Sequence, residues 1–228
     1  MDLENILRAE QVLKGKLVDT PMLDLESNKI TPFLSDALKV KMKLELFQHV
    51  GSFKSRGVLL GIASLSADQR RTGVIAVSAG NHALAVSWAS NLLSIDAKVI
   101  MPKTADPSRI QGCKTFGANI ILVENAEEAF ALMEQLASEE GREIMHPFEA
   151  SHMILGAATC GLEMIRSMPE MDIAIVPVGG GGLIAGVSLA IRSVKPSVKV
   201  FGVEPFGADS MFQSIKEKKP VKLDRVST

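Results

Sequence analysis

The sequence predicts an α/β protein organised around a mostly parallel β-sheet. Beyond residue 73, short apolar segments alternate with longer segments that have the periodicity of helices. The short segments, for example residues 74–77 and 172–178, are almost continuously apolar instead of alternating with polar residues. Strands of this kind are typical of parallel sheets that helices cover on both faces.

The chain before residue 74 predicts helices, one strand and a polar connection. In order, these are a helix over 3–14, a short helix over 35–38, a strand over 40–46, a helix that contains the apolar run 58–63 and ends at about residue 65, and a loop or helix end over 66–73.

The rest of the chain predicts alternating strands and helices. Strands are expected over 74–77, 97–101, 119–123, 143–148 (ending at Pro147), 172–178 and 198–203. Helices are expected over 83–93, 108–116, 126–137, 153–168, 183–194 and from 210 to 216.

Length and charge restrict the class of protein. The 228 residues suit one large domain or two modest ones, and 46% hydrophobic residues allow a substantial core. Because 25 Lys and Arg balance 26 Asp and Glu, there is no electrostatic case for binding nucleic acid or a charged membrane surface.

The cysteines and the apolar segments indicate the compartment. Cys113 and Cys160 lie far apart, so neither a disulfide framework nor a zinc pattern is available. The start of the chain is acidic, unlike a signal peptide, and the apolar runs are well short of the ~18 residues that span a bilayer. We therefore expect a cytoplasmic protein without membrane partners.

Lys54 is the first candidate for a reactive group. It lies in Val50-Gly51-Ser52-Phe53-Lys54-Ser55-Arg56-Gly57, between an expected strand and an apolar helix. A lysine that points from such a junction into a cleft loses water, and its deprotonated amine becomes a nucleophile for a carbonyl. Taken alone, the segment fits a surface lysine better, but two glycine-containing loops favour the reactive role.

The run Gly179-Gly180-Gly181-Gly182 follows an apolar strand and begins a helix. Four glycines let several backbone N–H groups point at one place, and the helix N-terminus adds a positive dipole end, so the run predicts a phosphate site. A flexible turn or a tight helix–strand contact is the alternative. The spacing matches neither the dinucleotide fingerprint nor the P-loop, which disfavours NAD and ATP.

The loop Ser78-Ala79-Gly80-Asn81-His82 also joins a strand to a helix, where open α/β sheets bind ligands. Asn81 can donate and accept hydrogen bonds, although a plain helix cap by Ser78 or Asn81 is an equal alternative. His82 fits a structural role better than a catalytic one. A reactive lysine, a phosphate loop and an Asn loop are together the parts that hold pyridoxal phosphate.

These three segments resemble the signature segments of the serine/threonine dehydratase branch of the fold-type II (tryptophan-synthase-β-like) pyridoxal phosphate enzymes. The resemblance runs from Thr20-Pro21 to the end of the chain. Three further segments agree with it, namely Lys43-Leu44-Glu45, His146-Pro147-Phe148 and Gly202-Val203-Glu204-Pro205.

The resemblance implies a role for each matching residue. Lys54 would bind the cofactor covalently and then act as the base at the substrate α-carbon. The implied cofactor-binding residues are Phe53, Lys54, Asn81, Gly179, Gly180, Gly181, Gly182 and Leu183. The implied residues for the substrate carboxylate are Ser78, Ala79, Gly80, Asn81 and His82.

The resemblance also implies architecture and activity. Two open, mostly parallel sheets with helices on both faces would form a large domain from residues 1–71 and 150–228 and a small mobile domain from 72–149. The reaction would be β-elimination from L-threonine or L-serine, which gives a 2-oxo acid and ammonia. The full-length form would be a homodimer.

Departures from the family pattern narrow the activity. Ala79 replaces the second serine of the racemases and cannot move a proton, which disfavours racemisation. The loop also differs from the Thr-Ser-Gly-Asn-Thr type of the sulfhydrylases, which disfavours cysteine synthesis. In relatives that bind a divalent cation, the ligands would correspond to Glu204, the Ala208 carbonyl and a second acidic residue. Ser210 stands at the position of that second acid, so no metal is expected.

The family continues beyond the position of Thr228, so we expect a C-terminally truncated form of such an enzyme. The first alternative is a catalytically impaired or inactive fragment, which binds the cofactor poorly or only packs against a partner. A related lyase for a substituted serine or for hydroxyaspartate is the second.

Overall fold

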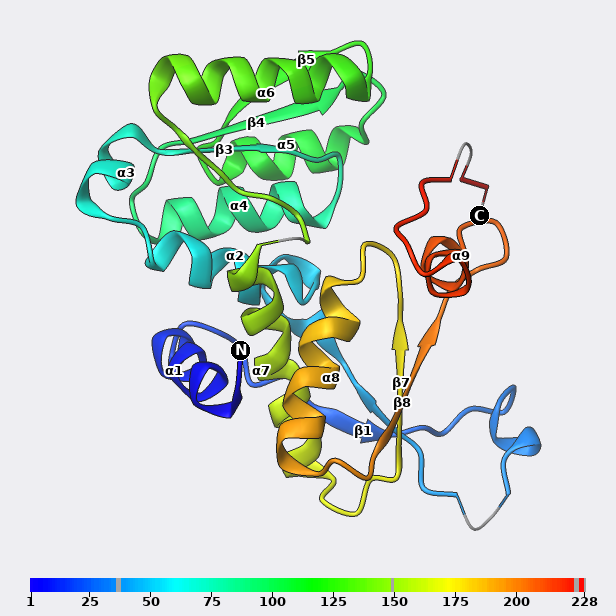
Figure 1. Cartoon of the computed structure of the whole chain (residues 1–228). Helices are drawn as coiled ribbons and strands as arrows, with labels where there is room; N and C mark the ends of the chain where they lie inside the picture. The colour runs from blue at the N-terminus through cyan, green and yellow to red at the C-terminus, as the bar shows by residue number, and fades with distance from the viewer. Residues whose placement is uncertain (36–37, 149, 224–225, 228) are drawn as a thin grey trace.

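The computed structural model describes residues 1–35, 38–148, 150–223 and 226–227 as an α/β structure with three sheets among them (Figure 1). The strands are β1 (Met22–Asp24), β2 (Lys41–Lys43), β3 (Val74–Val77), β4 (Ala97–Pro102), β5 (Asn119–Val123), β6 (Glu143–Ile144), β7 (Ile173–Pro177) and β8 (Lys199–Val203). The α-helices are α1 (Leu3–Leu13), α2 (Lys54–Ala63), α3 (Ala67–Thr72), α4 (Asn81–Leu92), α5 (Pro107–Thr115), α6 (Ala126–Glu140), α7 (Ser151–Ser167), α8 (Gly182–Val194) and α9 (Ser210–Glu217). Short 3-10 helices are η1 (Thr31–Phe33), η2 (Glu45–Phe47) and η3 (His49–Gly51).

The four-stranded sheet has the order β5-β4-β3-β6, and each neighbouring pair is parallel. Figure 1 shows α6 on one face and α4 with α5 on the other. Ile75 and Ile100 pack with Met133 of α6, whereas Val74 and Val99 belong to the core that includes α4. Helices therefore cover both faces of this sheet, as its apolar strands predict.

The sheet of β7 and β8 is also parallel, and α7 and α8 cover one of its faces. Ala174 and Val176 are buried on that face. On the other face, Ile175 is 68% exposed and Phe201 is 51% exposed. Within the described residues, this face of the sheet has no helix on it, although the apolar strands predict cover on both sides.

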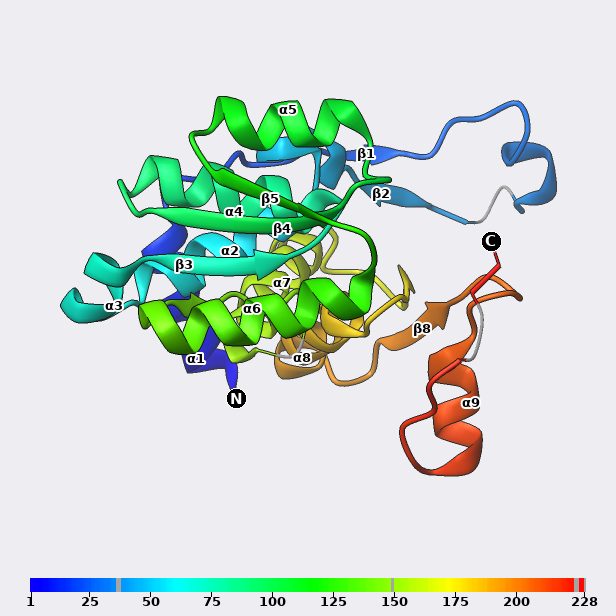
Figure 2. The same cartoon turned by 90° about the horizontal axis from the view of Figure 1, so that it is seen from above.

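Helices α2 and α7 connect the two parallel sheets, because α2 packs on α4 and α7, and α7 packs on α8. Glycines make their crossing close. A Cβ atom on Gly156 would lie 2.3 Å from the backbone nitrogen of Gly57. Seen from above (Figure 2), the connection between β1 and β2 and helix α9 both extend away from the four-stranded sheet.

Several local predictions differ from the structure. The polar residues 66–73 contain α3, because Ser66 and Gln69 form a reciprocal capping box that starts a helix. The strand expected over 143–148 is only β6, which pairs with two residues of β3. The strand β1 was not expected, and part of the helix expected over 35–38 lies outside the described residues.

No described helix is long and apolar enough to cross a membrane.

Candidate active site

Lys54 is the first residue of α2, and the loop before it fixes its position. Val50 has a φ of 55° and Gly51 has a φ of 72°. The left-handed conformation is rare for a β-branched residue such as Val50. The buried Ser55 hydroxyl donates to the loop carbonyls, 2.9 Å from the oxygen of Ser52 and 3.1 Å from that of His49. The turn is therefore tied to the helix that carries the lysine.

The Lys54 amine points toward the segment of residues 145–148. Its Nζ donates to the carbonyl oxygen of Pro147 and lies 5.2 Å from the centre of the Phe53 ring. Burial lowers the pKa of Lys54 below its ordinary value because the charged ammonium loses water. A lowered pKa makes the neutral, nucleophilic amine more available at neutral pH.

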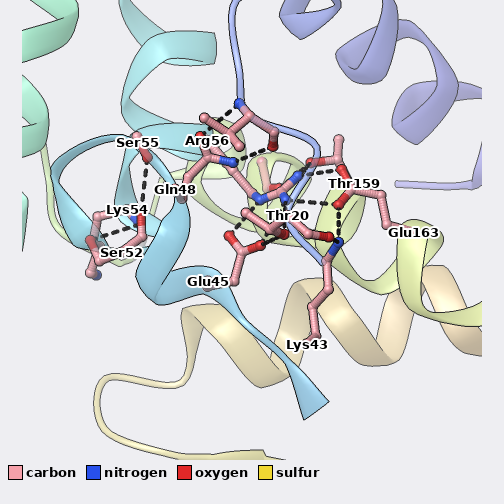
Figure 3. A network of polar contacts seen from close by, with 12 residues as sticks. Thr20, Lys43, Glu45, Gln48, Ser52, Lys54, Ser55, Arg56, Thr159 and Glu163 are labelled. Atoms are coloured by element: carbon pink, nitrogen blue, oxygen red, sulfur yellow. Dashed lines mark hydrogen bonds and ion pairs between the residues drawn. The ribbon is translucent and has the colours of Figure 1, made fainter. Parts of the chain in front are cut away.

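A buried charge network holds α2 two residues beyond Lys54 (Figure 3). Arg56 is 1% exposed. Its guanidinium donates to both carboxylate oxygens of Glu45, at 2.7 and 2.8 Å, and to both of Glu163, at 2.6 and 2.8 Å. The Nζ of Lys43 lies 2.6 Å from Glu163. Two cations thus face two carboxylates at the junction of β2, η2, α2 and α7.

The network stays ionised because its partners outweigh desolvation. Burial alone would lower the pKa of Arg56, but hydrogen bonds and charges from Glu45 and Glu163 raise it. Burial alone would raise the pKa of Glu163, but Arg56 and Lys43 lower it. Removing one partner would leave a charge unpaired, at a cost of about 3–5 kcal/mol. The network therefore anchors the first turn of α2.

The glycine loop, residues 179–182, connects β7 to α8. Gly181, with a φ of 80°, precedes the helix, and no described side chain caps it. A Cβ on Gly180 would lie 2.6 Å from the Phe148 ring, so any other residue there would have to displace the ring. A Cβ on Gly179 would meet nothing within 4 Å. The loop therefore leaves the N-terminus of α8 available to an anion.

The Asn loop connects β3 to α4, which begins at Asn81. The Ser78 hydroxyl accepts from the Gly80 N–H at 3.1 Å, before the helix starts. The Asn81 side-chain Oδ1 accepts from Arg109 Nη1 at 2.6 Å. No described side chain caps α4, so the alternative prediction of a plain cap by Ser78 or Asn81 is wrong.

His82 is buried beside this loop. Its Nε2 lies 2.7 Å from the Met145 carbonyl oxygen. A carbonyl only accepts, so Nε2 carries the hydrogen and Nδ1 is an acceptor, which has no partner among the described residues. Burial lowers the pKa of His82 to about 4, and the charges of Lys54, His146 and His152 add to this effect. The imidazole is therefore neutral at physiological pH.

Residues 145–148 bring the three predicted motifs together. His82 contacts the carbonyl of Met145, Lys54 contacts that of Pro147, and Phe148 packs on Gly180. A desolvated amine, an uncapped helix N-terminus with glycines and the loop that carries Asn81 thus contact one short segment, the last of them through His82. These residues fit pyridoxal phosphate, which needs an amine for its carbonyl carbon and N–H donors for its phosphate.

Glu204 has a structural partner in this chain. Its two carboxylate oxygens accept from the backbone N–H groups of Met211, at 2.9 Å, and Phe212, at 2.8 Å. The carboxylate therefore stabilises the first turn of α9. The described residues contain no group of three or more potential metal-ligating side chains.

Arg109, which contacts Asn81, and Glu163, which belongs to the charge network beside Lys54, were not predicted from the sequence. Arg109 lies in the first turn of α5, and a partial signal for it exists, because helices that follow adjacent parallel strands begin at the same edge of a sheet. Glu163 lies toward the C-terminal end of α7, and no sequence signal links it to Arg56.

Comparison with known proteins decides the family. The family model described as pyridoxal-phosphate dependent enzyme matches residues 16–228. The chain belongs to this family. It is 43% identical over 222 residues to the phenylserine dehydratase of Ralstonia pickettii, covering 97% of this chain and 67% of that protein.

The family resemblance extends to other enzymes. The chain is 37% identical over 225 residues to the L-threonine ammonia-lyase of Thermotoga maritima, covering 97% of this chain and 55% of that enzyme. Maize serine racemase superposes with a TM-score of 0.92 at 33% identity, covering 99% of this chain and 69% of that one. The predicted fold class, family and cofactor are confirmed. The chain thus spans 67% of the length of the phenylserine dehydratase and 55% of that of the L-threonine ammonia-lyase.

Proposed function

We propose that this chain forms the cofactor site of a pyridoxal-phosphate-dependent lyase that removes water from a β-hydroxy amino acid, such as L-threonine or L-serine. The observation that carries the proposal is the partly buried Lys54 amine, which faces the same segment that packs on the glycine loop. The products are a 2-oxo acid and ammonia. The family and the dehydratase and ammonia-lyase relatives support this reaction class.

Bound pyridoxal phosphate supplies an electron sink for the charge that develops at the substrate α-carbon. Lys54 would hold the cofactor covalently before substrate binds and, once the substrate amine has replaced it, would take the α-proton as a free amine, whose neutral form its lowered pKa favours. The backbone N–H groups of residues 179–183 bind the phosphate, and Asn81 donates to the ring oxygen. The loop of residues 78–82 receives the substrate carboxylate, and Phe53 borders the cofactor ring.

The proposal also includes a domain movement, a homodimeric assembly and a cytoplasmic location. Residues 72–149 form a small domain that moves against residues 1–71 and 150–228 when substrate binds. The active form is a homodimer, which light scattering tests. The protein works in the cytoplasm, in keeping with its two widely separated cysteines.

The substrate assay tests the reaction. With added cofactor, wild-type protein is expected to release 2-oxo acid from L-threonine or L-serine, and Lys54→Ala is expected to release none above background. Lys43→Ala is not a suitable control because Lys43 anchors the charge network, so the exposed Lys103→Ala serves instead. Equal rates for wild type and Lys54→Ala would refute the assignment.

A substituted serine is the second candidate substrate class. The relative with 43% identity is a phenylserine dehydratase, and this likeness supports a substrate that carries an aryl group on its β-carbon. The ratio of kcat/KM for phenylserine to that for threonine separates the two. Racemisation is not expected, because the exposed Ala79 has no group that carries a proton.

A further inference from the structure

Arg109 and Asn81 form a hydrogen bond between two helices that start at the same edge of the four-stranded sheet. Arg109 lies in the first turn of α5, and Asn81 is the first residue of α4. Arg109 Nη1 is 2.6 Å from Asn81 Oδ1. Both side chains are partly buried, so the contact is shielded from bulk water.

Close packing one turn further along the two helices fixes this contact. Leu84 lies three residues after Asn81, and Gly112 lies three residues after Arg109. A Cβ on Gly112 would lie 2.8 Å from Leu84 Cδ2, so the glycine allows α5 to approach α4 closely. The Asp106 carboxylate, which is the nearest acid along the chain, accepts from the Ser108 N–H at 2.7 Å and caps α5.

The chemistry of the two groups fixes the orientation of the amide. A guanidinium has five donors and no acceptor, so the Asn81 atom that faces it must be the carbonyl oxygen. The Nδ2 group, which only donates, then points away from Arg109. Within the described residues, the structure records no partner for this Nδ2 group. The two N–H groups of Asn81 Nδ2 therefore remain available to a ligand.

The cation also changes the strength of those donors. A charged donor on the amide oxygen polarises the amide, which makes its N–H groups better donors in a partly desolvated site. An amide held in this way favours an ionised oxygen over a hydroxyl group, because a hydroxyl would also bring a hydrogen to the contact.

We propose that Arg109 is a positioning residue that holds the Asn81 amide with its N–H groups toward the ring oxygen of pyridoxal phosphate. The inference rests on the proposed function, since it assumes that Asn81 contacts the cofactor. Arg109 itself acts through Asn81 and needs no contact with cofactor or substrate.

The experiment measures equilibrium binding of pyridoxal phosphate to the purified chain, together with the pH dependence of the visible absorbance of the bound cofactor. Arg109→Met keeps the aliphatic stem and removes every donor. Its cofactor Kd is expected to rise roughly tenfold, as for the loss of one charge-assisted hydrogen bond. The pH midpoint of the absorbance change is expected to rise, because the ionised ring oxygen loses an oriented donor.

Two further variants separate positioning from general damage. Arg109→Lys keeps one charged donor and is expected to stay within about threefold of the wild-type Kd. Arg142→Gln removes another partly buried arginine, which pairs with Glu140 and Asp96 away from Asn81. It is expected to leave the absorbance midpoint unchanged even where it lowers stability.

The outcomes are distinguishable from failure of the proposed function. If wild type binds the cofactor at Lys54 while Arg109→Met keeps the same Kd and midpoint, the inference is wrong and the proposed function stands. The inference is also overturned if Arg109→Lys loses as much affinity as Arg109→Met. If wild type does not bind the cofactor at Lys54, the proposed function fails and the inference fails with it.

Discussion

At the scale of single residues, burial sets the chemistry of the ionisable groups around Lys54. The pKa values of Lys54 and His82 are both lowered, and desolvation is the leading cause for each. Arg56 is buried as well, yet its two carboxylate partners keep it charged. The site thus separates a lysine with a lowered pKa from an arginine that is permanently protonated, although the two lie two residues apart.

The buried His82 predicts a loss of stability in mild acid. Its pKa is about 4 in the folded state, against an ordinary value of 6.5. Above pH 6.5 the group contributes its full stability. As the pH falls from 6.5 to 4, the unfolded chain gains a proton that the folded chain cannot, which lowers the unfolding free energy by about 3 kcal/mol.

Denaturant unfolding from pH 7.5 to 4.5 measures this effect. His82→Gln keeps a donor for the Met145 carbonyl and cannot titrate, so its stability should fall less over this range than that of wild type. Parallel curves for the two proteins would show that His82 is not the titrating group.

At the scale of elements, glycines decide how closely the helices that carry the site can pack. Gly156 of α7 lies against the backbone of Gly57 in α2, three residues beyond Lys54. The same crossing brings Glu163, on the following turns of α7, to Arg56. A wider crossing would therefore disturb both the charge network and the start of α2.

Gly156→Ala is expected to destabilise the chain by about 2 kcal/mol or more, because a Cβ only 2.3 Å from the Gly57 nitrogen forces the helices apart. Gly179→Ala is the matched control for stability, since a Cβ there meets nothing within 4 Å. Thermal unfolding without cofactor compares the two. Equal unfolding temperatures would contradict the close crossing.

The sequence predicted elements and motifs better than it predicted their contacts. Short apolar segments between helical segments predicted the strands β3, β4, β5, β7 and β8 within about two residues at either end. The polar composition of residues 66–73 concealed α3, since a capping box outweighed it. The chemistry and the family resemblance of the Lys54, Asn81 and glycine segments predict that they form one site.

The contacts that complete the site lie far apart in the sequence. Arg56 reaches Glu163 across 107 positions, and Arg109 reaches Asn81 across 28. Only tertiary packing brings such partners together, so periodicity and local motifs cannot predict them. The left-handed Val50 was also beyond prediction, because β-branched residues rarely adopt this conformation.

At the scale of the whole molecule, the two parallel sheets differ in how their faces are covered. Helices cover both faces of the four-stranded sheet. In the β7–β8 sheet, Val176 is 3% exposed under α7 and α8, while its neighbour Ile175 is 68% exposed. The open face is a continuous apolar surface that also includes Ile173, Phe201 and Val203.

Adjacent substitutions test this difference in exposure. Val176→Ala is expected to cost about 2 kcal/mol, because it removes buried methyl groups and leaves a cavity. Ile175→Ser is expected to change stability by no more than about 0.5 kcal/mol and to reduce binding of a hydrophobic dye. Denaturant unfolding and dye fluorescence measure both. A larger loss of stability for Ile175→Ser than for Val176→Ala would reverse the assignment of the faces.

The central claim is that Lys54, the Asn loop and the glycine loop form one pyridoxal phosphate site. The most direct test is to add pyridoxal phosphate to the purified chain, reduce with borohydride and map the modified peptides by mass. The structure predicts one dominant adduct, on Lys54, and none on Lys43, whose buried amine is held by Glu163. Adducts scattered over exposed lysines, or an adduct on a folded Lys54→Arg variant at the wild-type level, would contradict it.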